Sequence, residues 1–173
     1  INGIEAGHIT IACFASISRN WLPKIIYTFR QNYPGVEIEL MEGGTDDIVS
    51  WVMNQQADFG LLSRRHVKGL EWISLYEDPL MAVLPKDYPL ENESAFAVSN
   101  FSDKPFIISA EGVDYDIHQA IEDAHIHPFT PFSSKDDHAI VSMVANHLGL
   151  SILPQLVIQG VEHLVRAMPL SPY

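Results

Sequence analysis

Strand-like and helix-like segments alternate from residue 8 to residue 62, and this alternation constrains the fold more than any other feature. Residues 8–14 and 36–40 have the pattern of half-buried strands, and residues 59–62 form a third apolar run. Between them, apolar side chains recur at helical spacing over 21–29 and again over 48–53. Strands separated by helices of this length form βαβ units, so we expect a parallel sheet with right-handed crossovers.

The pattern restarts near Glu77, which predicts a second α/β unit. Gly149 directly follows the apolar stripe of its longest helix, and we expect this glycine to be a left-handed C-cap. The strand-like segments are 80–84, 106–109, 129–132, 150–153 and 164–169, and helices are expected over 117–124, 136–147 and from 154.

Composition and charge exclude several classes of protein. With 173 residues, 47% of them hydrophobic, the chain can bury one substantial core or two small ones, and no apolar run approaches the roughly 18 residues of a membrane span. A net charge of −12 argues against direct contact with nucleic acid, which needs a basic surface. The single cysteine, Cys13, rules out an internal disulfide and is interpreted as a small core residue. The start of the chain has no signal-peptide pattern, so we expect the cytoplasm.

Three predicted helix starts carry hydroxyl groups or bare backbone directly after a strand. They are Ser16–Ser18, Gly43–Thr45 and Ser133-Ser134. Because helix N-termini leave unpaired N–H donors and a partial positive charge, several at one place would bind a carboxylate or phosphate. The alternative is that Thr45 and Ser134 only cap their own helices, since residues 134–137 resemble a capping box.

No pattern of catalytic or metal-binding residues stands out. The chain lacks a nucleophile elbow, a P-loop, a GxGxxG fingerprint and an HExxH helix, so no catalytic residue and no cofactor are predicted. His125 and His127 lack supporting ligands, and no metal is predicted. Asp114 and Asp116 are interpreted as solvated helix-start residues. Arg64-Arg65 could neutralise an anionic ligand or could form a surface turn.

A series of different short motifs is spread over nearly the whole chain. They are Gly7–Ile11, Ser16 through Pro23, Phe29-Arg30, Tyr33–Ile38, Glu42–Thr45, Ala57–Leu61, Leu80–Pro85, Tyr88–Leu90 and Val144 through Pro154. In order and spacing this series resembles the effector-binding domain of LysR-type transcription regulators.

The resemblance implies an α/β fold like that of type 2 periplasmic binding proteins, with two α/β subdomains and a ligand cleft between them. Subdomain I would comprise residues 1–76 and subdomain II residues 77–173. In family members the chain returns to subdomain I after a strand like 164–170, so subdomain I would be incomplete here. A winged helix-turn-helix would precede Ile1.

Carried over residue by residue, the resemblance places the effector contacts at helix starts and strand ends. Glu111 is a departure, because it puts an acid where the family often receives carboxylates, and it favours a ligand with an amine or hydroxyl or else points to solvent. The expected ligand-binding residues are Ser16, Ile17, Ser18, Gly44, Thr45, Ser63, Ala110, Glu111, Gly112, Ser133 and Ser134.

The function implied is sensing of a small, anionic metabolite, with DNA bound only through the absent N-terminal domain. Family members form dimers or tetramers, and helices 20–32 and 136–147 would be the contact between chains. A transport-type solute-binding protein with the same fold is the first alternative, and an enzyme on this fold is the second. No membrane partner is expected.

Overall fold

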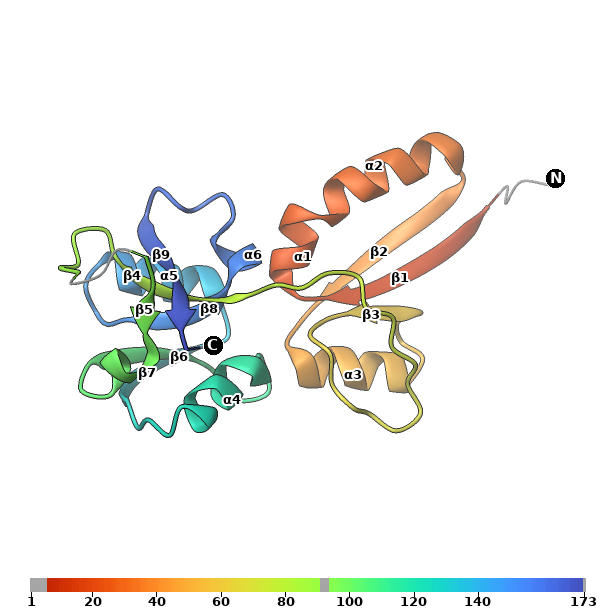
Figure 1. The fold of residues 1–173 in the computed structure, drawn as a ribbon. Helices are drawn as coiled ribbons and strands as arrows, with labels where there is room; N and C mark the ends of the chain where they lie inside the picture. The colour runs from red at the N-terminus through yellow and green to blue at the C-terminus, as the bar shows by residue number, and fades with distance from the viewer. Residues whose placement is uncertain (1–5, 91–93, 173) are drawn as a thin grey trace. The chain divides into compact units, whose positions relative to one another are not determined.

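The computed structural model describes residues 6–90 and 94–172. The chain divides into two compact units, Ile1–Leu75 (unit 1) and Tyr76–Tyr173 (unit 2). Each unit contains both strands and helices, in the order drawn in Figure 1.

Unit 1 is built on a three-stranded parallel sheet of order β2-β1-β3. Its strands are β1 (Gly7–Cys13), β2 (Val36–Glu42) and β3 (Phe59–Leu61), and its helices are α1 (Ala15–Asn20), α2 (Leu22–Asn32) and α3 (Thr45–Met53). Helices α1 and α2 lie along one side of the sheet and α3 along the other (Figure 1). The prediction of βαβ units with a parallel sheet is confirmed.

The first predicted helix is divided in two. Trp21 separates α1 from α2, and Pro23 stands in the first turn of α2, where its missing N–H needs no partner. Leu22 is the one buried residue of α2, all of whose residues are described. Helix α2 therefore begins at Leu22 and not at Asn20 as predicted.

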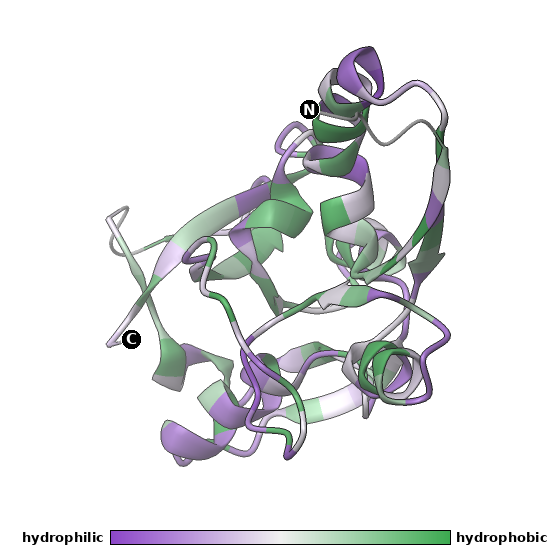
Figure 2. Ribbon diagram, turned by 90° about the vertical axis from the view of Figure 1, so that its right-hand side faces the viewer, coloured by the Kyte–Doolittle hydropathy of each residue, from purple (hydrophilic) through white to green (hydrophobic). Residues whose placement is uncertain are grey.

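Unit 1 has a small core on the α3 side of its sheet. Ala12 of β1, Ile48 of α3 and Ala57 are buried together, and partly buried Trp51 and Met41 pack against them. Helices in Figure 2 are banded with hydrophobic and hydrophilic residues, as expected for helices that cover one face of a sheet.

Unit 2 has a mixed arrangement of strands, which sequence periodicity did not predict. Its four-stranded sheet has the order β5-β9-β4-β8, in which β4 runs antiparallel to both β8 and β9, while β6 and β7 form a parallel pair. The strands are β4 (Leu80–Pro85), β5 (Phe96–Ala97), β6 (Pro105–Ser109), β7 (Phe129–Ser134), β8 (Ser151–Pro154) and β9 (Val165–Ser171). The helices are η1 (Val98–Phe101), α4 (Tyr115–Asp123), α5 (Asp137–Ala145) and α6 (Gln155–Ile158).

A row of aromatic rings runs through the larger core of unit 2. Phe96 lies 4.9 Å from Phe101, and Phe101 lies 5.3 Å from Phe106 in an edge-to-face arrangement, measured between ring centroids. Both Phe101 and Phe106 are fully buried, as is Ile140 of α5. The row therefore joins η1 and β6 to the apolar face of α5.

Gly149 is required for close packing, and the expectation that it caps α5 is wrong. The left-handed residue after α5 is His147, with φ 61°. A Cβ on Gly149 would lie 2.6 Å from the carbonyl oxygen of Pro105. The backbones approach here because Leu150 N donates to Pro105 O (2.9 Å) and Ile107 N donates to Leu150 O (2.8 Å).

Gly149→Ala is therefore expected to lower the free energy of unfolding by about 1–3 kcal/mol, because the added methyl meets backbone atoms that cannot move aside. His147→Gly, in contrast, relieves a left-handed backbone and is not expected to destabilise the chain. Urea denaturation of both variants checks this. The reverse ranking would mean that Gly149 is the cap.

Candidate functional site

The three strands of unit 1 end at one edge of the sheet. Because they are parallel, Cys13 lies opposite both Glu42 and Leu61, which are the last residues of β2 and β3. Gly43 N donates to Cys13 O at 3.2 Å, and Phe14 N donates to Leu61 O at 3.3 Å. The segments that follow these strands thus leave the sheet side by side, and they carry the predicted residues Ser16–Ser18, Gly44-Thr45 and Ser63.

The two serines of α1 differ in what they contact. Ser18 hydrogen bonds through Oγ to the carboxylate of Glu42 and lies 3.0 Å from Ala15 O, so its hydroxyl is already engaged. Ser16 is 4% exposed and has no hydrogen-bond partner among residues 6–90 and 94–172. Ile17, also buried, donates its N–H to Phe14 O at 3.0 Å. The two hydroxyls of α1 therefore differ, because that of Ser18 is engaged by Glu42 and Ala15 while that of Ser16 has no such contact among the described residues.

Cys13 is the last residue of β1 at this edge, and its thiol is not reactive. Burial raises its pKa to about 11, and the negative charge of Glu42 adds to the effect. A thiol that stays protonated at neutral pH is a poor nucleophile. The interpretation of Cys13 as a core residue agrees with its full burial.

The N-terminus of helix α3 is capped within the helix, and the capping residue is not Thr45. Gly44 is the N-cap residue, and its N–H donates to Asp47 Oδ2 at 3.1 Å. Thr45 is the first helical residue and is 3% exposed, so the alternative in which Thr45 caps the helix is wrong. Asp46 also stands in the first turn, which places two carboxylates at this N-terminus.

Residues predicted to bind a ligand in unit 2 also gather at a strand edge. Ser109 and Ser134 end β6 and β7 opposite each other, and Ala110 N donates to Ser134 O at 2.8 Å. A turn over 110–113 follows, closed by Val113 N donating to Ala110 O, with Gly112 at φ 80° and Glu111 exposed. Ala110, Glu111, Gly112, Ser133 and Ser134 therefore share one edge.

The expectation that Ser133-Ser134 opens the long helix is wrong. Both serines belong to β7, and the N-cap of α5 is Asp136, whose Oδ1 accepts from His138 N (2.8 Å) and Ala139 N (3.3 Å). Ser134 Oγ accepts from Asp136 N at 3.0 Å, but Ser134 lies two residues before the N-cap position and does not cap the helix. Parallel pairing with β6 extends the strand through Ser134, and a carboxylate then satisfies two N–H groups of the helix.

Two buried polar residues of unit 2 were not predicted as site residues. Ser109 is 1% exposed, and its Oγ has no partner within the described ranges, while its carbonyl accepts from His118 Nε2 at 3.0 Å. Asp114 is the N-cap of α4, accepting from Asp116 N at 2.9 Å, and is 7% exposed. Its interpretation as a solvated residue is wrong. An aspartate directly before a helical stripe is a recognisable cap signal, but its burial depends on the tertiary fold.

Burial, together with the neighbouring carboxylates of Asp116 and Asp137, raises the pKa of Asp114 to about 7. The backbone N–H groups of Asp116 and Ile117 lower it in part, because they hydrogen bond to the ionised form. This carboxyl therefore changes its protonation within the physiological pH range.

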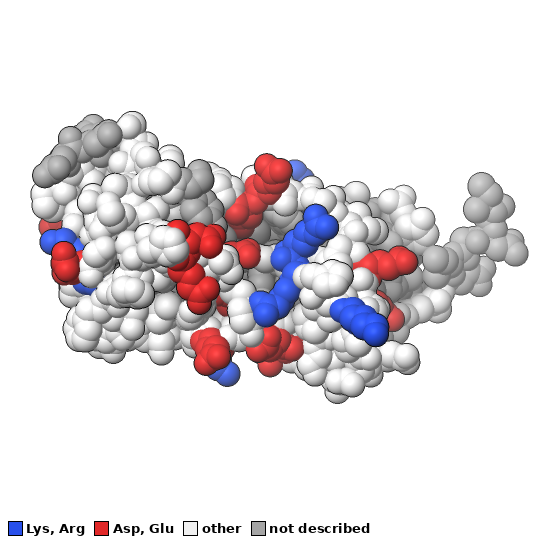
Figure 3. Space-filling model, turned by 60° about the horizontal axis from the view of Figure 1, so that its bottom comes forward, with Lys and Arg blue, Asp and Glu red and all other residues white. Residues whose placement is uncertain are grey.

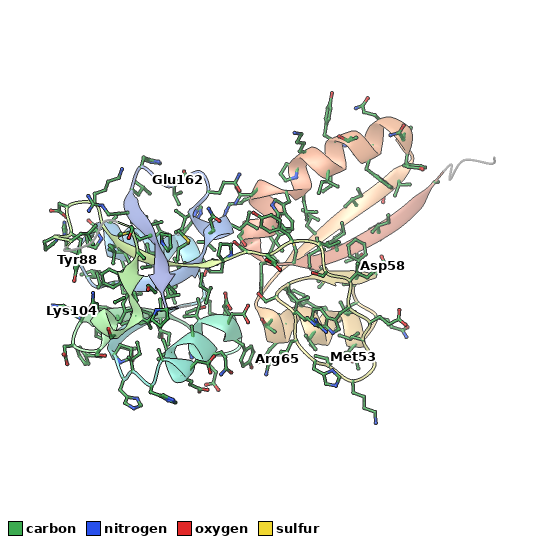
Figure 4. All side chains as sticks on the ribbon, in the orientation of Figure 1. Met53, Asp58, Arg65, Tyr88, Lys104 and Glu162 are labelled. Carbon is green, nitrogen blue, oxygen red and sulfur yellow. The ribbon has the colours of Figure 1, made fainter. Side chains whose placement is uncertain are left out.

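The described residues offer ligand-binding groups but no assembled metal centre. No group of three or more His, Cys, Asp or Glu side chains that could hold a metal ion occurs within the described ranges. Arg65, labelled in Figure 4, belongs to the exposed loop after β3, and Asp58, also labelled, precedes β3 and accepts from Thr10 N at 2.7 Å. Within the same residues, no helix is both long and apolar enough to span a membrane.

Comparison with known proteins identifies the family. Residues 2–173 match the family described as LysR substrate binding domain. The chain is 30% identical over 166 residues to the uncharacterized HTH-type transcriptional regulator YvbU of Bacillus subtilis, covering 94% of this chain and 56% of YvbU. The chain thus spans just over half the length of this relative. Since the relative is a transcriptional regulator, the transport-protein alternative is not favoured.

Solved structures confirm the expected fold. The regulatory domain of Synechocystis CcmR, solved in complex with 2-PG, superposes with a TM-score of 0.87 at 19% identity, covering 96% of this chain and 82% of that one. The effector-binding domain of QuiR, solved in complex with shikimate, gives 0.85 at 18% identity, covering 98% and 83%. Both have the type 2 periplasmic-binding-like α/β fold. The chain belongs to the LysR substrate binding domain family, the effector-binding domains of LysR-type transcription regulators.

Proposed function

We propose that this chain senses a small anionic metabolite through residues at the strand edges of its two units, which correspond to subdomains I and II of the family. The observation that carries the proposal is Ser16, a residue 4% exposed at the edge of unit 1 whose hydroxyl has no hydrogen bond among the described residues. A hydroxyl that no other described side chain engages is available to donate to an anionic group of a ligand.

The remaining predicted residues support the same role in different ways. Ile17, Gly44 and Thr45 bring buried backbone to the edge of unit 1, and Ser63 follows β3 there. Ala110, Gly112, Ser133 and Ser134 do the same for unit 2. Ser18 acts indirectly, because its hydroxyl holds Glu42 in place.

Sensing requires only that the effector binds two states of the regulator with different affinity. A ligand shifts an equilibrium by no more than that difference, and a coupling of about 1–3 kcal/mol is ordinary for such proteins. No bond is made or broken, so the chain is not an enzyme in this proposal. In the whole protein, an N-terminal winged helix-turn-helix would bind DNA in the cytoplasm, and the chains would pair as a dimer or tetramer.

Thermal unfolding of the chain against a panel of small carboxylates, amino acids, sugar phosphates and aromatic acids tests the proposal. A compound present at a hundred times its dissociation constant should raise the midpoint by about 5–10 °C. Ser16→Ala is expected to reduce the affinity for that compound at least tenfold, because the hydroxyl is its partner in the complex.

Ser50→Ala is the matched control, since Ser50 is exposed on α3 and its Oγ accepts from Asn54 Nδ2 of the same helix turn. It should leave the affinity unchanged within a factor of two. A compound whose binding is indifferent to both substitutions would show that the effector site lies elsewhere, and turnover of any compound would contradict the sensing role.

A further inference from the structure

We propose that residues 110–116 form a pH-sensitive switch, in which the closed segment keeps the buried Asp114 carboxyl protonated and opening of the segment releases that proton to water. The segment includes Ala110, Glu111 and Gly112, so its bearing on effector binding rests on the proposed function. The switch itself belongs to the chain without a ligand and is tested in that form.

Backbone hydrogen bonds hold this segment closed. Ala110 N donates to Ser134 O at 2.8 Å, and Val113 N donates to Ala110 O at 3.2 Å. Asp116 N donates to Asp114 Oδ1 at 2.9 Å. Asp114 is the one buried residue of the segment, whose residues are all described, and it is 7% exposed. Opening need not disturb the pairing of β6 with β7, so it is expected to cost much less free energy than unfolding of unit 2.

Two carboxylates on different helices act on the charge of Asp114. Its burial, together with Asp116 on α4 and Asp137 at the start of α5, raises its pKa to about 7. The N–H groups of Asp116 and Ile117 lower this pKa only in part. The chain as a whole adds negative charge, since 22 acidic residues stand against ten Lys and Arg, and Figure 3 shows acidic side chains close together on part of the surface. An ionised Asp114 is therefore costly while the segment stays closed.

The other titratable groups of these elements have contacts of their own or lie in solvent. Nε2 of His118, on α4, lies 3.0 Å from the last carbonyl oxygen of β6. Oδ1 of Asp136 accepts from His138 N at the start of α5. Glu111 of the turn and Lys135, which precedes α5, are exposed. Hydration on opening of the segment is therefore the direct way to stabilise an ionised Asp114.

The pH dependence of opening follows from the two environments of this carboxyl. In the open segment a hydrated Asp114 ionises at its ordinary pKa of 3.8, compared with about 7 in the closed segment. Between these values opening releases a proton, so the equilibrium constant for opening rises about tenfold for each pH unit. Above pH 7 the carboxyl is ionised in both forms, so opening should level off there.

Hydrogen exchange of the chain without a ligand, measured from pH 5 to pH 8 and corrected for the intrinsic rate at each pH, tests the switch. The protection factors of the Ala110, Val113 and Asp116 amides should fall about tenfold per pH unit between pH 5 and 7, and then level off. Urea below the unfolding transition should leave these factors unchanged, because local opening exposes little surface. The same urea should lower protection of the Ile107 amide, which donates to Leu150 O in the core.

Asp114→Asn should remove the pH dependence, because asparagine does not ionise and still accepts from Asp116 N. Asp103→Asn is the matched control, since it changes an exposed carboxyl of the same unit, and it should keep the slope of the unsubstituted chain. Protection that is independent of pH in the unsubstituted chain, or that keeps its slope in Asp114→Asn, would overturn the proposal. So would equal urea dependence at Val113 and Ile107, because Asp114 would then reach water only on unfolding of the unit.

Failure of this inference is distinguishable from failure of the proposed function, because the exchange experiment contains no effector. If protection over residues 110–116 depends on pH as expected but no compound of the thermal panel binds, the switch stands and the sensing role fails. If a compound binds and loses affinity in Ser16→Ala while protection of the segment is independent of pH, the sensing role stands and the switch is wrong.

Discussion

Phe106→Ala is expected to lower the free energy of unfolding by about 3–5 kcal/mol, the largest destabilisation expected for this chain. Phe106 is fully buried in β6, its ring meets that of Phe101 edge to face, and its backbone bridges to Leu150. Truncation would leave a cavity between β6, η1 and α5, which the surrounding backbone hydrogen bonds prevent from collapsing. Urea denaturation at neutral pH measures the change.

Phe129→Ala serves as the control for this prediction. Phe129 lies on the neighbouring strand β7 and is 68% exposed, so the same truncation removes little buried surface. Its free energy of unfolding should change by less than about 1 kcal/mol. Similar losses in the two variants would contradict the placement of the unit 2 core.

Asp114→Asn is expected to stabilise the chain at pH 8, by an amount on the order of 4 kcal/mol if the whole pKa shift is realised. Burial raises the pKa of Asp114 from 3.8 to about 7 in the folded chain. Between these two values the folded state keeps a proton that the unfolded state has released. Folding stability therefore falls as pH rises from about 4 to 7, and the full cost persists above pH 7.

Asparagine removes this cost while keeping an oxygen that accepts from Asp116 N, since Asn and Asp are comparable N-caps. The gain should become small near pH 4, where Asp114 is neutral in the folded state and the unfolded state also binds much of the proton. Thermal midpoints measured from pH 4 to pH 8 check this, with Asp103→Asn as the control at an exposed carboxyl of the same unit. A gain that is independent of pH would contradict the assignment of the raised pKa.

Local sequence patterns predicted the architecture of unit 1 well, because each of its elements has its own periodicity. Alternation over residues 8–14 and 36–40 corresponds to β1 and β2, and the parallel pairing follows from the helices between them. The strand pairing of unit 2 could not be predicted in the same way, because β4 pairs antiparallel with β8 and β9, which lie about 70–90 residues further along the chain. Such pairing depends on long-range packing that no local pattern encodes.

The site residues show the same division. The hydroxyl residues after each strand could be found from sequence, since turn and helix-start residues are recognisable. Their contacts could not be found, because the engagement of Ser18 by Glu42 and the buried, unpartnered hydroxyl of Ser109 depend on side chains distant in sequence. Ser134 was wrongly predicted to begin helix α5, because Asp136, two residues later, is the N-cap of that helix.

Hydrogen exchange of the chain with and without the compound selected by thermal unfolding tests the central claim most directly. If the chain senses a small molecule through these edges, added compound should slow exchange of backbone amides in residues 14–18, 43–46, 61–65, 109–113 and 133–134. Ser16→Ala should abolish that protection at the same concentration. Protection confined to other segments, or protection that persists in Ser16→Ala, would contradict the proposed site.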